Sequence, residues 1–318
     1  MKNNKKKNLL RLGLCCVFKR EPIKFRTTTA AALQKFNRRG GLERLSEIVL
    51  HNANSLKEAL EYCGRNQIGA FRVKSELFPL RTHPVAGYEL KELPEWERIH
   101  SLFKKSRLFA KKHDIRLTFH PDQFVVLNSP RPEVVVSSIS ELEHHGEMAE
   151  FLGADVINVH AGGVYGDKKA ALERLEKNIG RLSVRVRERL TLENDDKSYS
   201  PSDLLAFCRH AGIPFVYDVH HHRCLQDGIT EEKTMSAAIT TWDREPLFHI
   251  SSPLNGWKGK NPNRHHDFVD IQDFPEHWLD LTVTVEVEAK AKELAVRRLQ
   301  QDLHRVKYEN IKKIYISI

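Results

Sequence analysis

The sequence of 318 residues predicts one α/β domain built as a (β/α)8 barrel. Eight short β-rich runs are present, and an amphipathic stretch follows nearly every one. The chain has no GxGxxG turn, which favours the barrel over a doubly wound open sheet. Hydrophobic residues make up 40% of the chain, enough for a large core. Because no repeat or linker divides the sequence, residues 1–318 are expected to form a single domain.

The strand candidates are rich in Val, Ile, Leu and Phe, and most are bounded by Gly, Pro, Asp or Asn, as buried parallel strands are. In chain order they are LRLGLCCVF (10–18), IGAFRVK (68–74), IRLTFHP (115–121), DVINVHAGG (155–163), LTLEND (190–195), PFVYDVH (214–220), PLFHISS (246–252) and TVTVEVEAK (282–290).

Apolar residues spaced by three and four predict the helices between these strands. The candidates are residues 42–64, 94–113, 132–153, 169–190, 200–212, 230–240 and 289–306. The first ends on Gly64, and the second and third begin at proline, which is a common first residue of a helix.

The N-terminal segment MKNNKKKNLLRLGLCCVF is basic and then apolar, as in a signal peptide. Its apolar part is short, is interrupted by Arg11 and Gly13, and lacks a small-residue cleavage site. We therefore expect residues 1–8 to form a basic, flexible tail before the first strand.

The net charge indicates the class of partner, and the cysteine content indicates the cellular compartment. A net charge of +9 favours a polyanion, with nucleic acid ahead of an anionic membrane surface. No apolar run reaches the roughly 18 residues of a membrane span. The five cysteines contain no CxxC pair, which indicates reduced thiols in a cytoplasmic protein.

Imidazoles and carboxylates recur where the predicted strands end, the position of the active-site face of a barrel. The candidates are His120, His160, Glu193, Asp218, His221, His249 and Glu288, with His265 in the loop after the seventh strand. Burying such groups costs several kcal/mol each unless they are paired or bind a metal. Their convergence predicts a metal centre.

Mixed His and carboxylate ligands suit Mn²⁺, Zn²⁺ or Fe²⁺ better than Mg²⁺. Eight candidates are too many for one ion with an open position, so two or three ions are expected. Each residue alone has a plainer interpretation: His120 orders the turn at Pro121, His160 ends a strand, Glu193 pairs with a lysine, and Asp218 caps a helix.

Seven motifs, in order, resemble the UV damage endonuclease family: HPDQFVVLNSP, INVHAGG, LTLEND, YDVHHHR, HISSP, RHHDFVD and VEAK. The opening LGLCC also fits. The resemblance implies a TIM barrel related to endonuclease IV. It also implies an enzyme that nicks DNA 5′ to pyrimidine dimers and other lesions with divalent metals, manganese prominent among them.

The resemblance assigns residues by motif. His120 matches the histidine of HPxQ, His160 that of VHxGG, and Glu193 and Asp218 the two central carboxylates. His221 matches the histidine three places after that aspartate. The remaining matched ligands are His249, His265 and Glu288.

Gln123 and Phe124 resemble the family's glutamine–aromatic pair, which probes the lesion by inserting into the duplex. The sequence departs from some relatives in two places. Leu14 and Cys15 stand where those relatives have a tyrosine, and Leu247 stands where they have a lysine able to contact metal.

The predicted mechanism is metal-assisted hydrolysis of a phosphodiester, with Glu193 bridging two ions and with Asp218 and His221 as further catalytic ligands. Lys258, Lys260 and Arg264 are expected to hold phosphates of lesion-containing double-stranded DNA, with Trp257 adding stacking. We expect a monomer that needs no nucleotide cofactor.

Three rival functions fit parts of this pattern: a sugar isomerase or epimerase with two metals, an abasic-site endonuclease, and a barrel that binds damaged DNA without cutting it. The positive charge and the Gln123–Phe124 pair count against the sugar enzyme.

Three consecutive histidines, residues 220–222, follow Asp218 and Val219, and each is a possible metal ligand. We expect His221 to reach the metals, His220 to point away or support them, and His222 with Arg223 to face the DNA groove.

Overall fold

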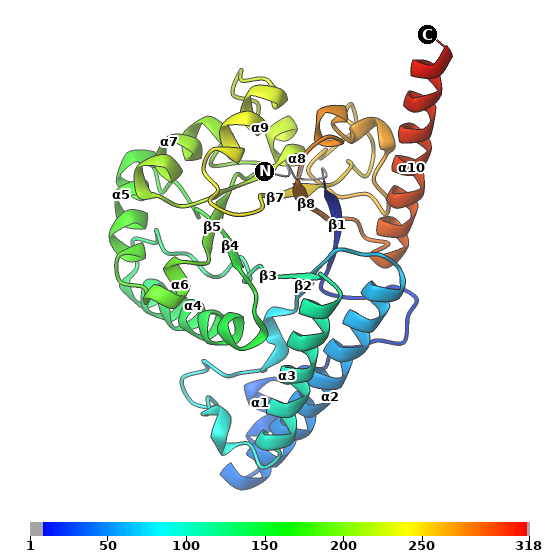
Figure 1. The fold of residues 1–318 in the computed structure, drawn as a ribbon. Helices are drawn as coiled ribbons and strands as arrows, with labels where there is room; N and C mark the ends of the chain where they lie inside the picture. Colours follow the sequence, from blue (N-terminus) through cyan, green and yellow to red (C-terminus); the bar gives the residue numbers. More distant parts are fainter. Residues whose placement is uncertain (1–8, 317–318) are drawn as a thin grey trace, which may run out of the picture.

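A computed structural model describes residues 9–316 of the chain, with side chains as far as Tyr308. Eight strands form a closed barrel in sequence order, and every neighbouring pair is parallel (Figure 1). The strands are β1 (Leu10–Cys15), β2 (Ala70–Val73), β3 (Arg116–Phe119), β4 (Val156–His160), β5 (Leu190–Glu193), β6 (Phe215–Asp218), β7 (Leu247–Ile250) and β8 (Val283–Val287).

The predicted (β/α)8 class is confirmed, because each of the eight predicted runs contains one strand. Helices cover the outer face of the barrel (Figure 1). Most strand residues are buried, as expected for a barrel whose interior is packed with side chains. The predicted basic tail, residues 1–8, lies outside the described residues.

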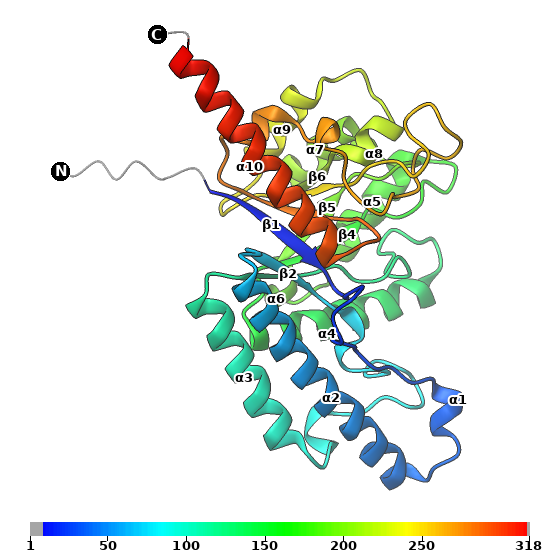
Figure 2. The ribbon, with the colours of Figure 1, turned by 90° about the vertical axis from the view of Figure 1, so that its right-hand side faces the viewer.

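The helices around the barrel include all those predicted by apolar spacing. They are α2 (Arg38–Arg65), α3 (Trp96–Lys112), α4 (Pro132–Leu152), α5 (Lys168–Ile179), α7 (Pro201–Ala211), α9 (Glu231–Ile239) and α10 (Glu293–Ile316). In Figures 1 and 2, α2 and α3 lie side by side beside β2.

Three short helices are additional. The single helix predicted over residues 169–190 is in fact two, because α5 ends at Ile179 and α6 (Val184–Arg187) begins only after a turn. Helix α1 (Ala30–Leu33) precedes α2, and α8 (Val219–Cys224) follows β6 with no intervening loop. The 3₁₀ turns are η1 (Ser75–Leu77), η2 (Leu90–Glu92), η3 (Ile271–Asp273) and η4 (Glu276–Trp278).

The barrel interior contains a small apolar cluster separate from the main core. Val156 of β4, Val216 of β6 and Leu247 of β7 are fully buried against one another. Since β4 and β6 are not neighbours in the sheet, their side chains meet inside the barrel. Leu247, two residues before His249, therefore fills this interior cluster.

No helix among the described residues is long and apolar enough to cross a membrane. All five cysteines are free thiols, as the absence of CxxC spacing predicted.

Gly13 of β1 provides space for a charged side chain inside the barrel. A methyl group added there would lie 3.0 Å from Cγ of Glu286 and 3.2 Å from Cβ of Ala70. By contrast, a methyl group added at Gly41 in α2 would meet nothing within 4 Å.

We therefore predict that Gly13→Ala lowers the free energy of unfolding by about 1–3 kcal/mol, because the barrel must shift to accept the methyl group. The control Gly41→Ala is expected to raise it by about 0.5–1 kcal/mol through reduced backbone entropy of the unfolded chain. Urea unfolding of both variants is the measurement. Equal effects of the two substitutions would contradict the crowding at Gly13.

Candidate metal centre

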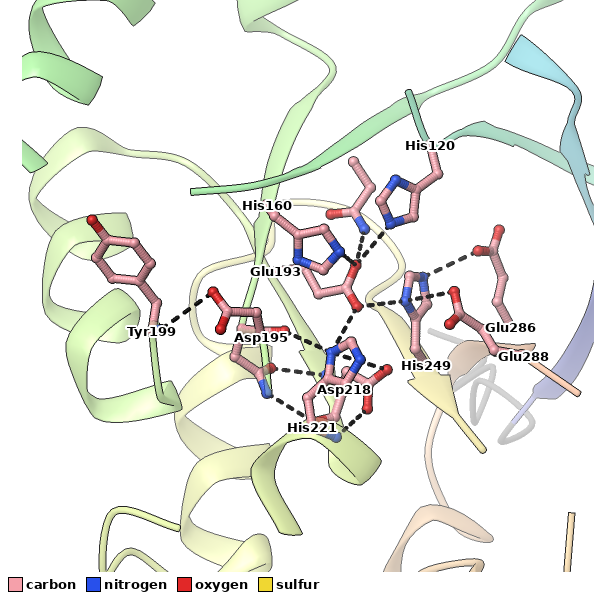
Figure 3. A network of polar contacts seen from close by, with 12 residues as sticks. His120, His160, Glu193, Asp195, Tyr199, Asp218, His221, His249, Glu286 and Glu288 are labelled. Carbon is pink, nitrogen blue, oxygen red and sulfur yellow. Dashed lines mark hydrogen bonds and ion pairs between the residues drawn. The ribbon is translucent and has the colours of Figure 1, made fainter. Parts of the chain in front are cut away.

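The polar residues predicted at the strand ends lie together at the carboxyl end of the barrel (Figure 3). His160, Glu193 and Asp218 are the last residues of β4, β5 and β6. His249 lies in β7, and His120 and Glu288 follow β3 and β8 directly. Parallel strands all end on one face, which explains why residues far apart in sequence meet here.

Glu193 is the centre of this arrangement and is fully buried. Its Oε2 lies 3.1 Å from His120 Nε2 and 3.9 Å from His160 Nε2. Its Oε1 lies 3.1 Å from His249 Nδ1 and 3.5 Å from His221 Nδ1. Four imidazoles therefore surround one carboxylate (Figure 3).

Seven of the eight predicted ligands fall into three groups whose ligand atoms lie within 4.8 Å of one another. The groups are His120–His249–Glu288, His120–His160–Glu193 and Glu193–Asp218–His221. Glu193 and His120 each belong to two groups, but only the carboxylate has two oxygens that could serve different groups, so Glu193 is the candidate bridging ligand. The eighth predicted ligand, His265, lies outside these groups, with Nδ1 3.9 Å from Glu288 Oε2.

Four buried atoms at this centre lack a hydrogen bond among the described residues: His160 Nδ1, Glu193 Oε1, Asp218 Oδ2 and His249 Nδ1. A buried carboxylate oxygen without a partner is costly, and each such atom in a native structure needs an explanation. Imidazole nitrogens and carboxylate oxygens are the donors that Mn²⁺, Zn²⁺ and Fe²⁺ accept. The residues thus fit divalent cations.

The charges of the centre depend on one another. Burial raises the pKa of Glu193, but the imidazoles of His249 and His160 outweigh it and hold that pKa well below its ordinary value. Burial lowers the pKa of His249, but Glu193 and Glu288 raise it overall to about 10. For His221, Asp218 and Glu193 likewise outweigh burial and raise the pKa well above the ordinary value. By contrast, burial dominates at His160 and lowers its pKa.

Asp218 has two roles, one for each carboxylate oxygen. Oδ1 accepts a hydrogen bond of 2.8 Å from the backbone N–H of His221 and so caps the first turn of α8. Oδ2 lies 3.6 Å from His221 Nδ1, inside the centre. The helix-cap and ligand interpretations of this residue are therefore compatible.

The three consecutive histidines lie in α8, where successive residues point about 100° apart. His221 points to Glu193 and Asp218, whereas its predicted role as a metal ligand stays a prediction. His220 is buried, and its Nδ1 is 3.2 Å from the carbonyl oxygen of Ser251.

The expectation that His222 faces the DNA groove is wrong. His222 is 4% exposed, with Nδ1 2.8 Å from the Tyr217 hydroxyl and Nε2 3.1 Å from Asp227 Oδ1. Arg223 also forms an ion pair within the protein, with its Nε 2.7 Å from Oε1 of Glu231. The physical reason is that residues 219–224 form helix α8, in which His222 points about 100° away from His221.

The predicted DNA-contacting residues lie in exposed loops on the same face. Gln123 and Phe124 follow β3, and Phe124 is 77% exposed. A cavity of 690 Å³ lies beside Phe124, with His120 in its wall. The remaining predicted contacts are the exposed Lys258, Lys260 and Arg264 in the loop between β7 and η3; none forms an ion pair with a described residue.

Trp257 in this loop is 36% exposed. Its ring lies 5.1 Å from that of His220, and its Nε1 donates a 2.7 Å hydrogen bond to Asp273. These contacts hold the ring against the end of the barrel.

Sequence reasoning missed two groups of buried polar residues inside the barrel. Asn158 of β4 donates a 2.5 Å hydrogen bond to Glu193 Oε2 and accepts one of 3.0 Å from Thr191. Arg72 of β2 and Glu286 of β8 form a second group beside His249. The available signal was a polar residue (Asn158) or a charged one (Arg72, Glu286) within a strand whose other residues are mostly apolar.

Comparison with known proteins places the chain in a family. The model of the family UV-endonuclease UvdE matches residues 10–317. The chain belongs to the UvdE family. The prediction made from its motifs is therefore confirmed.

The alignments with individual UvdE relatives cover most of this chain and most of each relative. A UV DNA damage endonuclease of Bacillus cereus (strain G9842) is 30% identical over 303 residues, 91% of this chain and 92% of the relative. The crystal structure of SacUVDE has a TM-score of 0.84 at 27% identity and covers 94% of this chain and 99% of its own. Endonuclease IV from Thermus thermophilus has a TM-score of 0.60 at 15% identity over 94% of this chain and 99% of its own, a likeness of fold alone.

We predict that metal binding releases protons and becomes tighter as the pH rises. The carboxylates around them raise the pKa of His249 to about 10 and that of His221 well above its ordinary value, which favours protonated rings before a metal binds. A metal needs the lone pair, so protons compete with it, by up to about tenfold in affinity per pH unit for each proton released. Calorimetry in buffers of different ionisation enthalpy measures this number. Binding without proton release would contradict the predicted charge states.

Proposed function

We propose that this protein is a DNA repair endonuclease that nicks the backbone 5′ to UV photoproducts by multi-metal hydrolysis. The observation that supports this most strongly is the buried Glu193 carboxylate, shared by two groups of ligand atoms. Membership of the UvdE family supports the DNA substrate. The proposal includes a cytoplasmic monomer, formed from one domain, that needs no nucleotide cofactor.

In this proposal the centre would hold two or three divalent ions, Mn²⁺ by preference and Zn²⁺ as the alternative, which would supply activation of water and charge compensation at the phosphate. Glu193 bridges neighbouring ligand groups, and Asp218 and His221 complete one of them. The other proposed ligands are His120, His160, His249, Glu288 and, from the adjacent loop, His265.

Other contacts within the protein hold the proposed ligands in position. Asp218 Oδ1 fixes the first turn of α8, so the His221 ring is held at the centre. Asn158 holds Oε2 of Glu193 in place. Because the centre is largely buried, water access is restricted and charge interactions are strengthened.

Recognition of the lesion is proposed for the loop after β3. An exposed aromatic ring that enters a duplex must unstack a base step, and a damaged step unstacks at lower cost. Phe124 is exposed beside a 690 Å³ cavity that extends to His120, and Gln123 is next to it. The proposed phosphate contacts are Lys258, Lys260 and Arg264, which contribute a salt-dependent part of the binding.

Incision of UV-irradiated plasmid with Mn²⁺ tests the proposal directly. We expect nicks in irradiated plasmid only, and end-labelled oligonucleotides should place each nick on the 5′ side of the dimer. Intact plasmid under every divalent metal tested would refute the proposal. Faster cutting of abasic than of dimer oligonucleotides would instead identify an abasic-site endonuclease.

We predict that Glu193→Gln lowers incision by roughly a thousandfold, the order of effect of losing a preorganised electrostatic contact. The amide has one acceptor oxygen and no charge, so metal content should fall as well. The matched control is Glu43→Gln, which removes an exposed carboxylate paired with Arg39 on α2. Metal analysis and plasmid incision measure both effects, and a metal-loaded, fully active Glu193→Gln variant would contradict the bridging role.

We predict that Phe124→Ala lowers kcat/KM for dimer DNA by a factor that corresponds to about 1–3 kcal/mol, the usual free energy of one aromatic–base stack. Metal content should not change, because Phe124 is not among the ligand groups. Leu108→Ala on α3, which is 57% exposed, serves as the control for removing a large apolar side chain from the surface. A similar loss from both substitutions would argue against insertion of Phe124.

A further inference from the structure

A buried charged group lies next to the metal centre, inside the barrel. Arg72 of β2 and Glu286 of β8 form an ion pair there, with a 2.6 Å hydrogen bond from Arg72 Nε to Glu286 Oε2. The Thr118 hydroxyl of β3 donates to the other oxygen, Oε1. Arg72 is 8% exposed, and Glu286 and Thr118 are each 1% exposed. The carboxylate of Glu286 is therefore fixed from two sides.

The two nitrogens of His249 face different surroundings. Nδ1 lies 3.1 Å from Glu193 Oε1 and 3.5 Å from Glu288 Oε1, both oxygens of proposed metal ligands. Nε2 lies 3.1 Å from Glu286 Oε2 and 3.0 Å from Arg72 Nη2. His249 is fully buried, so the orientation of the ring decides which nitrogen meets the metals.

The charges around the ring favour a cation at Nδ1 over one at Nε2. A metal ion on Nε2 would lie within a few ångströms of the Arg72 guanidinium, a cation in a buried site, where repulsion is strong. A metal on Nδ1 would instead lie among carboxylates. A neutral imidazole carries one proton, so Nδ1 offers its lone pair only when that proton is on Nε2.

Once the ring is neutral, as metal binding requires, two hydrogen-bond patterns compete at Nε2. Nε2–H donates to Glu286, or an unprotonated Nε2 accepts from Arg72 and leaves the proton on Nδ1, directed at Glu193. Only the first pattern is compatible with a metal on Nδ1. An ionised carboxylate accepts and never donates, so it selects this pattern.

We infer that Glu286 is a positioning residue of the metal centre: it holds the proton of His249 on Nε2 and so turns the lone pair of Nδ1 toward the metals. This inference rests on the proposed metal-dependent function. It adds to the ligands a residue that touches neither metal nor DNA.

Arg72 and Thr118 support this role. The guanidinium and the hydroxyl align the Glu286 carboxylate with Nε2. Arg72 Nη1 also lies 2.7 Å from Glu288 Oε1, which leaves Oε2 as the oxygen that faces His265. A buried ion pair is seldom more stable than an apolar pair of the same size, so stability alone gives little reason for charges here.

The test compares Glu286→Gln with Thr284→Val. The amide can accept from Nε2–H or donate to a bare Nε2, so it permits both positions of the proton. Thr284 is on the same strand and equally buried, but its hydroxyl donates to Glu245 and does not contact His249. Thr118→Val is the milder second variant, since it removes one donor and leaves the ion pair intact.

Two readouts are independent of incision. In zinc-loaded protein, ¹⁵N NMR of the histidine rings identifies the metal-bound nitrogen of His249 and the one that keeps its proton. Chelator competition measures zinc affinity. We expect Nδ1 ligation with a protonated Nε2 in the wild type, and a loss of about ten- to a hundredfold in affinity for Glu286→Gln. Thr118→Val should show a smaller loss, and Thr284→Val none.

The outcomes separate this inference from the proposed function. Zinc bound to His249 through Nε2, or unchanged affinity and proton position in Glu286→Gln, would overturn the role of Glu286 alone. A wild-type protein that binds no divalent metal would overturn the proposed function first. If Glu286→Gln does not fold, the wild-type proton position and the affinity of Thr118→Val decide the question.

Discussion

The centre of this structure depends on keeping one carboxylate, that of Glu193, charged although it is fully buried. Four histidines from four different segments lie within 4 Å of it and hold its pKa low. Each histidine is in place because a parallel strand ends there, or because a helix begins where a strand ends. The closed barrel is what allows separate strands to supply charge compensation at one point.

The inside of the barrel is divided between apolar and charged side chains. Val156, Val216 and Leu247 fill one part, whereas Arg72 and Glu286 fill another, beside Gly13. Large apolar residues at every inward position would have packed well, but they would have left His249 without a partner for Nε2. The charged residues of the interior thus support the adjacent polar centre, although an entirely apolar interior would have been simpler to pack.

The sequence allowed the fold class, the eight strands and seven clustered ligand candidates to be predicted, because these depend on local patterns and on the rule that parallel strands end on one face. It did not reveal α8, since six residues rich in histidine carry no apolar period. His222 was misplaced for that reason. The pairing of Arg72 with Glu286 was also missed, because the residues are 214 positions apart and nothing local links them.

Helix α8 begins at Val219, directly after Asp218 ends β6, with no loop between them. A loop would absorb an inserted or deleted residue, but a helix joined directly to a strand transmits it as a rotation of about 100°. One deletion before His221 would turn His222 toward Glu193 and remove the partner of Tyr217 and Asp227 from its buried position. The order of the three histidines is therefore constrained at every position, although only one of them faces the centre.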